Sequence, residues 1–190
     1  MVLQMVHCYS ANCKAPCPGR LCFVDLTGDL ADGYDKYSGS AAWRVLRSGH
    51  GLKESFKEDA ARLVYLTADS PNELTELKQD DMYVIGGLVD RNRHKGITLR
   101  KAEAEGIRHA KLPLQQHCQL SGSAVLTVNQ VVDLLLAWLD VRDWRIACNR
   151  AVPPRKRAAE GEAQRDGSPA LRLRDDGPEE QQEHIEVEQS

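Results

Sequence analysis

Residues 83–96 read YVIGGLVDRNRHKG, an apolar run that ends in two glycines and is followed by one Asp among basic side chains. A short, continuous apolar run bounded by turn residues is typical of a strand buried on both faces. Gly86 and Gly87 allow the backbone to approach a ligand closely, although adjacent glycines are also typical of an ordinary tight turn. The stretch therefore predicts a buried strand that ends at a candidate binding loop.

Four further segments have the composition of strands. They are LCFVD (21–25), the weaker WRVLR (43–47), LVYLT (63–67) and IRHAKLPL (107–114), which ends at Pro113. Helices are predicted to alternate with these strands. Strands and helices in alternation predict an α/β fold with a mostly parallel sheet and helices on both of its faces.

Two short helices are predicted between the strands. One begins at Pro71, because proline is favoured in a first helical turn and Ser70 and Glu73 have the spacing of a capping box. The other is TLRKAEAEG (98–106), which ends at Gly106.

The last apolar segment, AVLTV, leads into a longer helix predicted at residues 129–144. Its apolar residues occupy two faces, because Leu134 and Trp138 lie outside the stripe formed by Val128, Val131, Val132, Leu135, Leu136 and Leu139. A helix that is apolar around so much of its surface is predicted to be buried between partners.

The chain is expected to form one domain at residues 1–152 and a disordered, charged tail at 153–190. The tail holds six Lys or Arg and ten Asp or Glu but almost no large apolar residues, so it cannot form a core.

No segment is long enough to span a bilayer, and the start lacks the pattern of a signal peptide. We therefore expect an intracellular protein, in the nucleus and cytoplasm.

The six cysteines do not have the spacing of a zinc site. Cys8, Cys13, Cys17 and Cys22 are clustered, whereas Cys118 and Cys148 stand apart. We expect free thiols and no metal site, as is usual in a reducing compartment.

Ligands of parallel α/β sheets bind beyond the carboxyl ends of the strands, which places the candidate loops after Thr67, Ile85, Leu112 and Leu126. Neither G-x-G-x-x-G nor the phosphate-binding G-x-x-x-x-G-K-[ST] occurs in the sequence. A nicotinamide-dependent oxidoreductase or a P-loop nucleotidase is therefore disfavoured.

Four stretches resemble, in this order, the position-9 tRNA purine N1-methyltransferases of the SPOUT class. They are LVYLTADSPNEL (63–74), residues 83–114 with the block IGGLVDRNRHKG, AVLTVNQVVDLLL (124–136) and RDWRIACNRAVPPRK (142–156). The resemblance implies a SPOUT-type methyltransferase with a trefoil knot in its C-terminal half, one of the rare exceptions to unknotted chains. It also implies S-adenosylmethionine as the methyl donor, tRNA as the substrate, and a monomer. It favours guanine as the target base and leaves adenine as the alternative.

The resemblance also implies a cofactor site among the knot loops. Apolar walls and backbone hydrogen bonds suit an uncharged adenine and a methionyl sulfonium. The alternative is that these are ordinary core and turn residues, because most of them would look the same in any buried sheet. The implied cofactor-binding residues are Leu66, Thr67, Gly86, Gly87, Leu88, Val89, Asp90, Thr98, Leu112, Pro113, Ala124, Val125 and Leu126.

Asp90 is implied to be the catalytic residue, a general base that accepts the proton on guanine N1. Its basic neighbours would keep it ionised and therefore a weak base unless burial offsets them. The alternative is that Asp90 only caps the following turn. Asn92 would orient either Asp90 or the target base.

The resemblance also implies a rim of residues that bind tRNA. The competing interpretation is that they form a solvated loop and helix face. The residues are Arg91, Asn92, Arg93, His94, Lys95, Arg100, Lys101 and Lys111.

By the same resemblance, we expect the given sequence to begin within the family's first helix, without the basic N-terminal extension and the first strand. Two interpretations from different classes follow. One is an active tRNA methyltransferase. The other is a catalytically weak or inactive truncated form that acts as a cofactor- or RNA-binding module.

Overall fold

A computed structural model describes residues 1–87, 94, 96–118 and 126–152, which belong to one compact unit. The elements follow in the order α1 (Val2–Lys14), β1 (Cys22–Phe23), α2 (Gly28–Asp35), η1 (Ser40–Ala42), β2 (Leu46–Arg47), α3 (Leu52–Ser55), η2 (Ala60–Arg62), β3 (Leu63–Leu66), β4 (Met82–Ile85), α4 (Ile97–Ala104), β5 (Arg108–Ala110), α5 (Leu114–His117), α6 (Val128–Val141) and α7 (Trp144–Ala151). The domain boundary predicted after residue 152 and the tail at 153–190 stay predictions, because that segment lies outside the described residues.

The strands form two parallel sheets, with the orders β1-β2 and β4-β3-β5. In the larger sheet, Leu66 at the end of β3 is in register with Ile85 of β4 and Ala110 of β5. The predicted parallel α/β architecture is confirmed.

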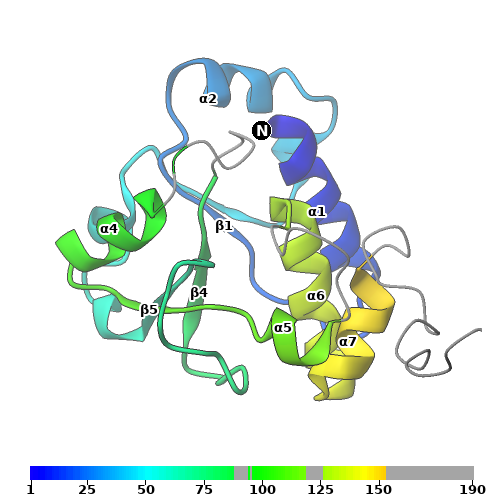
Figure 1. Cartoon of the computed structure of the whole chain (residues 1–190). Coiled ribbons are helices and arrows are strands. Elements are labelled where there is room, and N and C mark those ends of the chain that lie inside the picture. Colours follow the sequence, from blue (N-terminus) through cyan, green and yellow to red (C-terminus); the bar gives the residue numbers. More distant parts are fainter. Residues whose placement is uncertain (88–93, 95, 119–125, 153–190) are drawn as a thin grey trace, which may run out of the picture. The chain divides into compact units, whose positions relative to one another are not determined.

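Helices cover both faces of the larger sheet (Figure 1). On one face, Leu63 and Tyr65 pack in a cluster with Ala102 of α4. On the other face, Val64 and Leu66 pack with residues of α6. This arrangement follows from β3, whose four residues are all buried although successive side chains point to opposite faces.

Helix α6 is buried between partners, as predicted. Leu134 and Trp138 face the cluster shared with α7, whereas Val132 and Leu136 pack with Cys8 of α1. A capping box at Thr127 and Gln130 begins the helix.

The predicted extension of this helix to residue 144 is wrong. The chain leaves the helix at Arg142, which has a φ of 55°, and its guanidinium carbon lies 4.9 Å from the centre of the Trp138 ring. Asp143 then begins α7 by accepting a hydrogen bond from the Ile146 N–H (2.8 Å).

The helix predicted from Pro71 is absent, and residues 72–74 run alongside residue 111 instead. Lys111 N–H donates to the Asn72 carbonyl (2.8 Å), and Leu74 N–H donates to the Lys111 carbonyl (2.9 Å). Ser70 does not form the predicted capping box, because its hydroxyl accepts from Asn72 N–H (3.1 Å) and bonds His109 Nδ1 (2.9 Å). Pairing with a distant segment thus overrides the local helix signal.

The strands are shorter than predicted. Only Cys22–Phe23 and Leu46–Arg47 are paired in the smaller sheet, and Asp25 has a φ of 57°, which ends the extended conformation beyond β1. The helix over residues 98–106 is confirmed as α4, with Gly106 beyond its end at a φ of 65°.

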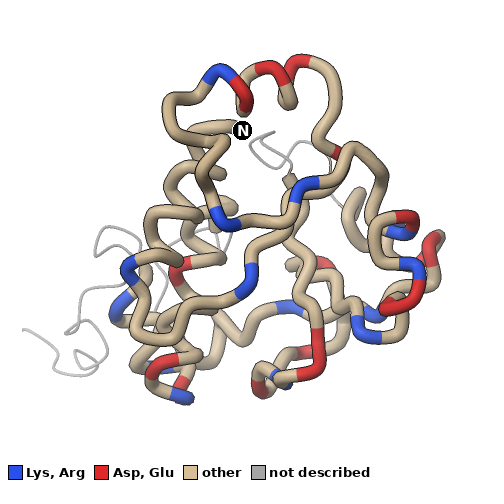
Figure 2. Tube along the Cα trace, turned by 180° about the vertical axis from the view of Figure 1, so that it is seen from behind, with Lys and Arg blue, Asp and Glu red and all other residues tan. Residues whose placement is uncertain are grey.

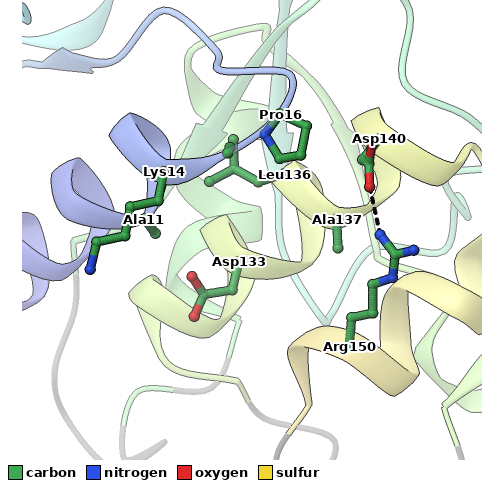
Figure 3. Close-up of a pocket in the computed structure, with 9 residues that line it drawn as sticks. Ala11, Lys14, Pro16, Asp133, Leu136, Ala137, Asp140 and Arg150 are labelled. Atoms are coloured by element: carbon green, nitrogen blue, oxygen red, sulfur yellow. Dashed lines mark hydrogen bonds and ion pairs between the residues drawn. The ribbon is translucent and has the colours of Figure 1, made fainter.

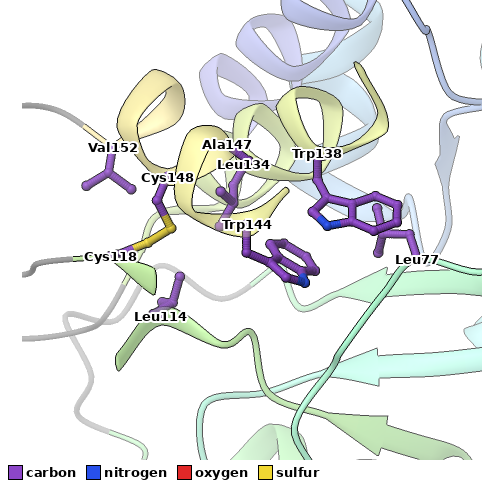
Figure 4. Packing of buried hydrophobic residues seen from close by; sticks show 9 residues of the cluster. All are labelled: Leu77, Leu114, Cys118, Leu134, Trp138, Trp144, Ala147, Cys148 and Val152. Atoms are coloured by element: carbon purple, nitrogen blue, oxygen red, sulfur yellow. A yellow bond between two sulfur atoms is a disulfide. The ribbon is translucent and has the colours of Figure 1, made fainter. Parts of the chain in front are cut away.

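The expectation of free thiols is wrong for one pair, because Cys118 and Cys148 form a disulfide (Figure 4). Cys8, Cys13, Cys17 and Cys22 are free. Burial, with the negative charge of Asp133 as a smaller cause, raises the pKa of the Cys8 thiol to about 11.

In the described part of the chain, no group of three His, Cys, Asp or Glu residues is arranged to hold a metal ion. None of the described helices has the length and hydropathy that a membrane span requires.

Candidate functional site

A cavity of about 280 Å³ opens at the carboxyl ends of β3 and β4. Its walls come from the residues that follow these strands, the first turn of α4, the segment after β5, and the start of α6. The parallel register of the three strands places their carboxyl ends at the same edge of the sheet. A cavity therefore lies at the edge of the sheet where the sequence predicts the binding loops, and the binding of a ligand there stays a prediction.

Six of the implied cofactor residues line this cavity: Leu66, Thr67, Gly86, Thr98, Leu112 and Leu126. Gly87 and Pro113 adjoin the lining in sequence but are not among the described residues that form it. Four other implied cofactor residues lie outside the described residues, namely Leu88, Val89, Ala124 and Val125. Asp90, which was assigned to both cofactor binding and catalysis, also lies outside them.

Two side-chain hydrogen bonds tie the first turn of α4 to the end of β3. The Thr98 hydroxyl donates to the hydroxyl oxygen of Thr67 (2.8 Å), which is buried. The Gly96 N–H donates to Asp69 Oδ2 (3.0 Å), which places a carboxylate at the N-terminus of α4, where a negative charge is favourable. These bonds fix the position of the α4 wall relative to the sheet.

The sequence analysis did not identify the charged and amide side chains of the lining as cofactor-site residues. Asp69 and Glu73 reach the cavity because the chain after β3 turns and then pairs with Lys111 instead of forming a helix. Gln116 Nε2 donates to Glu73 Oε1 (2.6 Å), and Gln115 is also part of the wall. Apolar walls with charges of both signs at the margin suit a ligand that joins an uncharged ring to a zwitterionic end.

The rim residues implied by the resemblance are only partly described. His94 and Lys111 line the cavity. Arg100 lies beside Gly96, because its guanidinium nitrogen is 3.0 Å from where a Cβ on that glycine would lie. Lys101 Nζ lies 4.0 Å from Glu105 Oε1. The remaining members, Arg91, Asn92, Arg93 and Lys95, lie outside the described residues.

Gly86 follows β4, lines the cavity and has close neighbours. A Cβ at this position would be 3.1 Å from Thr98 Cγ2 and 3.2 Å from the Tyr65 hydroxyl oxygen. Burial, with Glu105 as a smaller cause, raises the pKa of the Tyr65 hydroxyl and so favours its neutral form. Both neighbours are held in place, Tyr65 by the core and Thr98 by its bond to Thr67.

If the cavity holds the cofactor that the resemblance implies, Gly86→Ala is expected to weaken the binding of S-adenosylhomocysteine about 10-fold, because the added methyl group must displace the cavity wall. Titration calorimetry measures this change. Gly51→Ala is the matched control, since no atom lies within 4 Å of the position of its Cβ. Equal affinities of Gly86→Ala and the unmodified chain would contradict the close packing at this position.

A second cavity, of about 250 Å³, lies between α1, α6 and α7 (Figure 3). It is lined by small and apolar residues together with Lys14, Asp133, Asp140 and Arg150, of which the last two form an ion pair. Its lining contains no residue of a strand. This second cavity therefore does not lie at the carboxyl ends of the strands, where the first cavity lies.

Asp133 makes stability depend on pH at this second cavity. Desolvation raises the pKa of its carboxyl above 3.8, and the positive charge of His7 opposes the shift. Because the folded-state pKa is raised, the contribution to stability is fully present below pH 3.8 and is lost as the pH rises through the folded-state pKa. Asp133→Asn should therefore raise the Tm at pH 7 by a small amount, about 1–2 °C, because partial exposure screens the effect.

Thermal unfolding at pH 7 and at pH 3.5 measures this effect. The stabilisation by Asp133→Asn should disappear at the lower pH. A Tm of the variant that is lower at pH 7 than that of the unmodified chain would contradict the desolvation of this carboxyl.

Comparison with known proteins gives consistent matches in sequence and structure. A family model described as tRNA (guanine(9)-N(1))-methyltransferase TRM10/TRM10A matches residues 1–157. The rat protein tRNA methyltransferase 10 homolog A is 38% identical over 169 residues, which cover 87% of this chain and 50% of the rat protein. The Schizosaccharomyces pombe tRNA (guanine(9)-N1)-methyltransferase is 38% identical over 156 residues, covering 80% of this chain and 51% of its own. The chain thus spans about half the length of these curated relatives.

Solved structures agree with these matches. A crystal structure of full-length spTrm10 in complex with SAH superposes with a TM-score of 0.73 at 36% identity, covering 80% of this chain and 83% of that one. A dual specific Trm10 from Thermococcus kodakaraensis gives a TM-score of 0.59 at 18% identity, covering 79% of this chain and 87% of its own, which supports the fold alone. With the fold, the cavity and a family model over most of its length in agreement, the chain belongs to the tRNA (guanine(9)-N(1))-methyltransferase TRM10/TRM10A family.

Proposed function

We propose that this chain binds S-adenosylmethionine in the cavity at the carboxyl ends of β3 and β4 and transfers its methyl group to N1 of the guanine at position 9 of tRNA. One observation carries the proposal. In a chain of this family, six residues that the family resemblance implies as cofactor-binding line one cavity at the edge of a parallel sheet. The SAH bound to the related full-length spTrm10 supports the same class of ligand.

The residues of the cavity fit such a donor. Leu66, Leu112 and Val131 provide apolar walls for the adenine ring, and the close approach at Gly86 leaves the backbone accessible. Glu73 offers a negative charge that matches the ammonium group of the methionyl end. When bound, S-adenosylmethionine supplies an electrophilic methyl group on a sulfonium.

Asp90 is the proposed proton acceptor. It follows Gly87 by three residues in a stretch whose two ends, Gly86 and Gly96, are fixed next to Thr98 and Asp69. Guanine N1 carries a proton that must leave as the methyl group arrives, and a carboxylate within hydrogen-bond reach accepts it. The basic neighbours favour the ionised carboxylate, so positioning of the base next to the donor supplies much of the rate. Asn92 is proposed to orient Asp90 or the guanine.

The tRNA is proposed to bind across the opening of the cavity. Phosphate contacts are assigned to Arg91, Arg93, His94, Lys95, Arg100, Lys101 and Lys111. Over the described residues, charges of both signs are interspersed along the chain (Figure 2), so local grouping rather than net charge provides the attraction. Because position 9 lies in the folded tRNA core, its guanine must be extruded to reach the donor. A trefoil knot in the C-terminal half of the fold is part of the same proposal.

Two measurements on the full chain test the proposal. Titration calorimetry with S-adenosylhomocysteine should show one binding site. Tritiated S-adenosylmethionine should label a tRNA transcript with guanine at position 9, and a matched transcript with uridine at that position should remain unlabelled. Labelling that is equal in the two transcripts would contradict the assigned target. Binding without labelling of either transcript would favour a non-catalytic cofactor-binding module.

A further inference from the structure

The disulfide between Cys118 and Cys148 joins two elements that are far apart in the sequence. Cys118 ends α5 and Cys148 lies in α7, with 30 residues of separation and 5.4 Å between their Cα atoms. Both residues are buried, with exposed fractions of 5% and 1%. The pair lies in the core cluster that also contains Leu134 and Trp144 (Figure 4).

This core cluster and the candidate cofactor cavity share a side chain. Leu114 of α5 belongs to the cluster of the two cysteines and also lines the cavity next to Gln115. Helix α7 packs against α6, which supplies Val128 and Val131 to the same lining. The disulfide therefore connects the α5 wall of the cavity to the α6–α7 pair.

We propose that Cys118 and Cys148 form a reversible thiol–disulfide site whose oxidised state holds the α5 wall in place and thereby strengthens cofactor binding. This inference rests on the proposed role of the cavity in donor binding. A covalent tie restricts the wall before the ligand arrives, and such pre-organisation reduces the ordering cost of binding. In the reduced state the two thiols pack as small apolar groups, and only non-covalent contacts hold α5.

The oxidant is a low-molecular-weight disulfide, represented by oxidised glutathione. The Cys118 thiolate, the more exposed of the pair, attacks one of its sulfurs, forms a mixed disulfide and releases one thiolate. The Cys148 thiolate then attacks the Cys118 sulfur and releases the second. The two cysteines lose two electrons to the oxidant, and their two protons end on the two released thiols. An excess of a dithiol reductant reverses both steps.

The test compares one sequence in two redox states. The full chain is incubated with oxidised glutathione or with dithiothreitol, its free thiols are alkylated, and the Cys118 and Cys148 peptides are identified by mass spectrometry. The oxidised chain should bind S-adenosylhomocysteine about 2- to 10-fold more tightly in titration calorimetry, the range expected for the pre-ordering of one side chain. Its Tm should be higher by about 5–10 °C.

Variants separate this pair from the other thiols. Cys148→Ala should abolish both redox-dependent differences, whereas Cys13→Ala, which removes an exposed free thiol, should retain them. Alkylation of both Cys118 and Cys148 after treatment with oxidised glutathione would overturn the inference. Equal affinities of the two forms with the disulfide in place would overturn it too, and the donor-binding proposal would remain. Failure of both forms to bind the ligand would overturn that proposal and, with it, the inference.

Discussion

Asp90→Asn is expected to lower the single-turnover rate constant of methyl transfer about 100-fold, the lower end of what a positioned proton acceptor contributes. Asparagine keeps the size and hydrogen-bonding capacity of the side chain but cannot take up the N1 proton as a carboxylate does. The rate constant is measured with saturating tRNA and S-adenosylmethionine, so that altered binding does not contribute.

Asp35→Asn is the matched control for this substitution. Asp35 is an exposed residue of α2 that pairs with Arg47 at 3.1 Å, and the loss of such a surface pair should leave the rate constant unchanged. If Asp90→Asn transfers methyl at the rate of the unmodified chain, Asp90 is a turn-capping residue and another group accepts the proton.

Leu134→Ala is expected to reduce the free energy of unfolding by about 3 kcal/mol. The Leu134 side chain is fully buried, and it lies in the cluster where α6 meets α7 and the Cys118–Cys148 disulfide. Truncation removes the transfer free energy of the side chain and leaves a cavity among neighbours that the disulfide restrains.

Urea unfolding under one fixed redox condition measures this loss. Leu3→Ala in α1 is the matched control, because Leu3 is 69% exposed and the same truncation there should change stability by less than about 0.5 kcal/mol. A loss below about 1 kcal/mol for Leu134→Ala would show that this cluster is not the core that holds α6 in place.

The parts of the fold that were predictable from the sequence are those set by local patterns. The apolar runs of β3 and β4 and the glycine after α4 predicted buried parallel strands and a helix end. Both strands and the helix end are present and β3 is buried, but β4, which lies outermost in the order β4-β3-β5, is only half-buried. The same runs placed the candidate binding loops at one edge of the sheet, where Leu66, Gly86 and Leu112 line a single cavity.

The features that were missed depend on contacts between distant residues. Ser70 has the spacing of a helix cap, but His109 lies 39 residues away and bonds its hydroxyl, while residues 72–74 run beside residue 111. Asp69 and Glu73 reach the cavity through the same rearrangement. Neither the pairing of Cys118 with Cys148 nor the turn at Arg142, which has positive φ without glycine, carries a local signal.

The most direct test of the central proposal is a single-turnover reaction of this chain with a tRNA transcript that has guanine at position 9, followed by nuclease digestion and mass spectrometry of the product. The expected product is 1-methylguanosine at position 9, formed by the unmodified chain and strongly reduced with Asp90→Asn. Saturation of the chain with S-adenosylmethionine and tRNA without any 1-methylguanosine would contradict the proposal that this chain is an active methyltransferase.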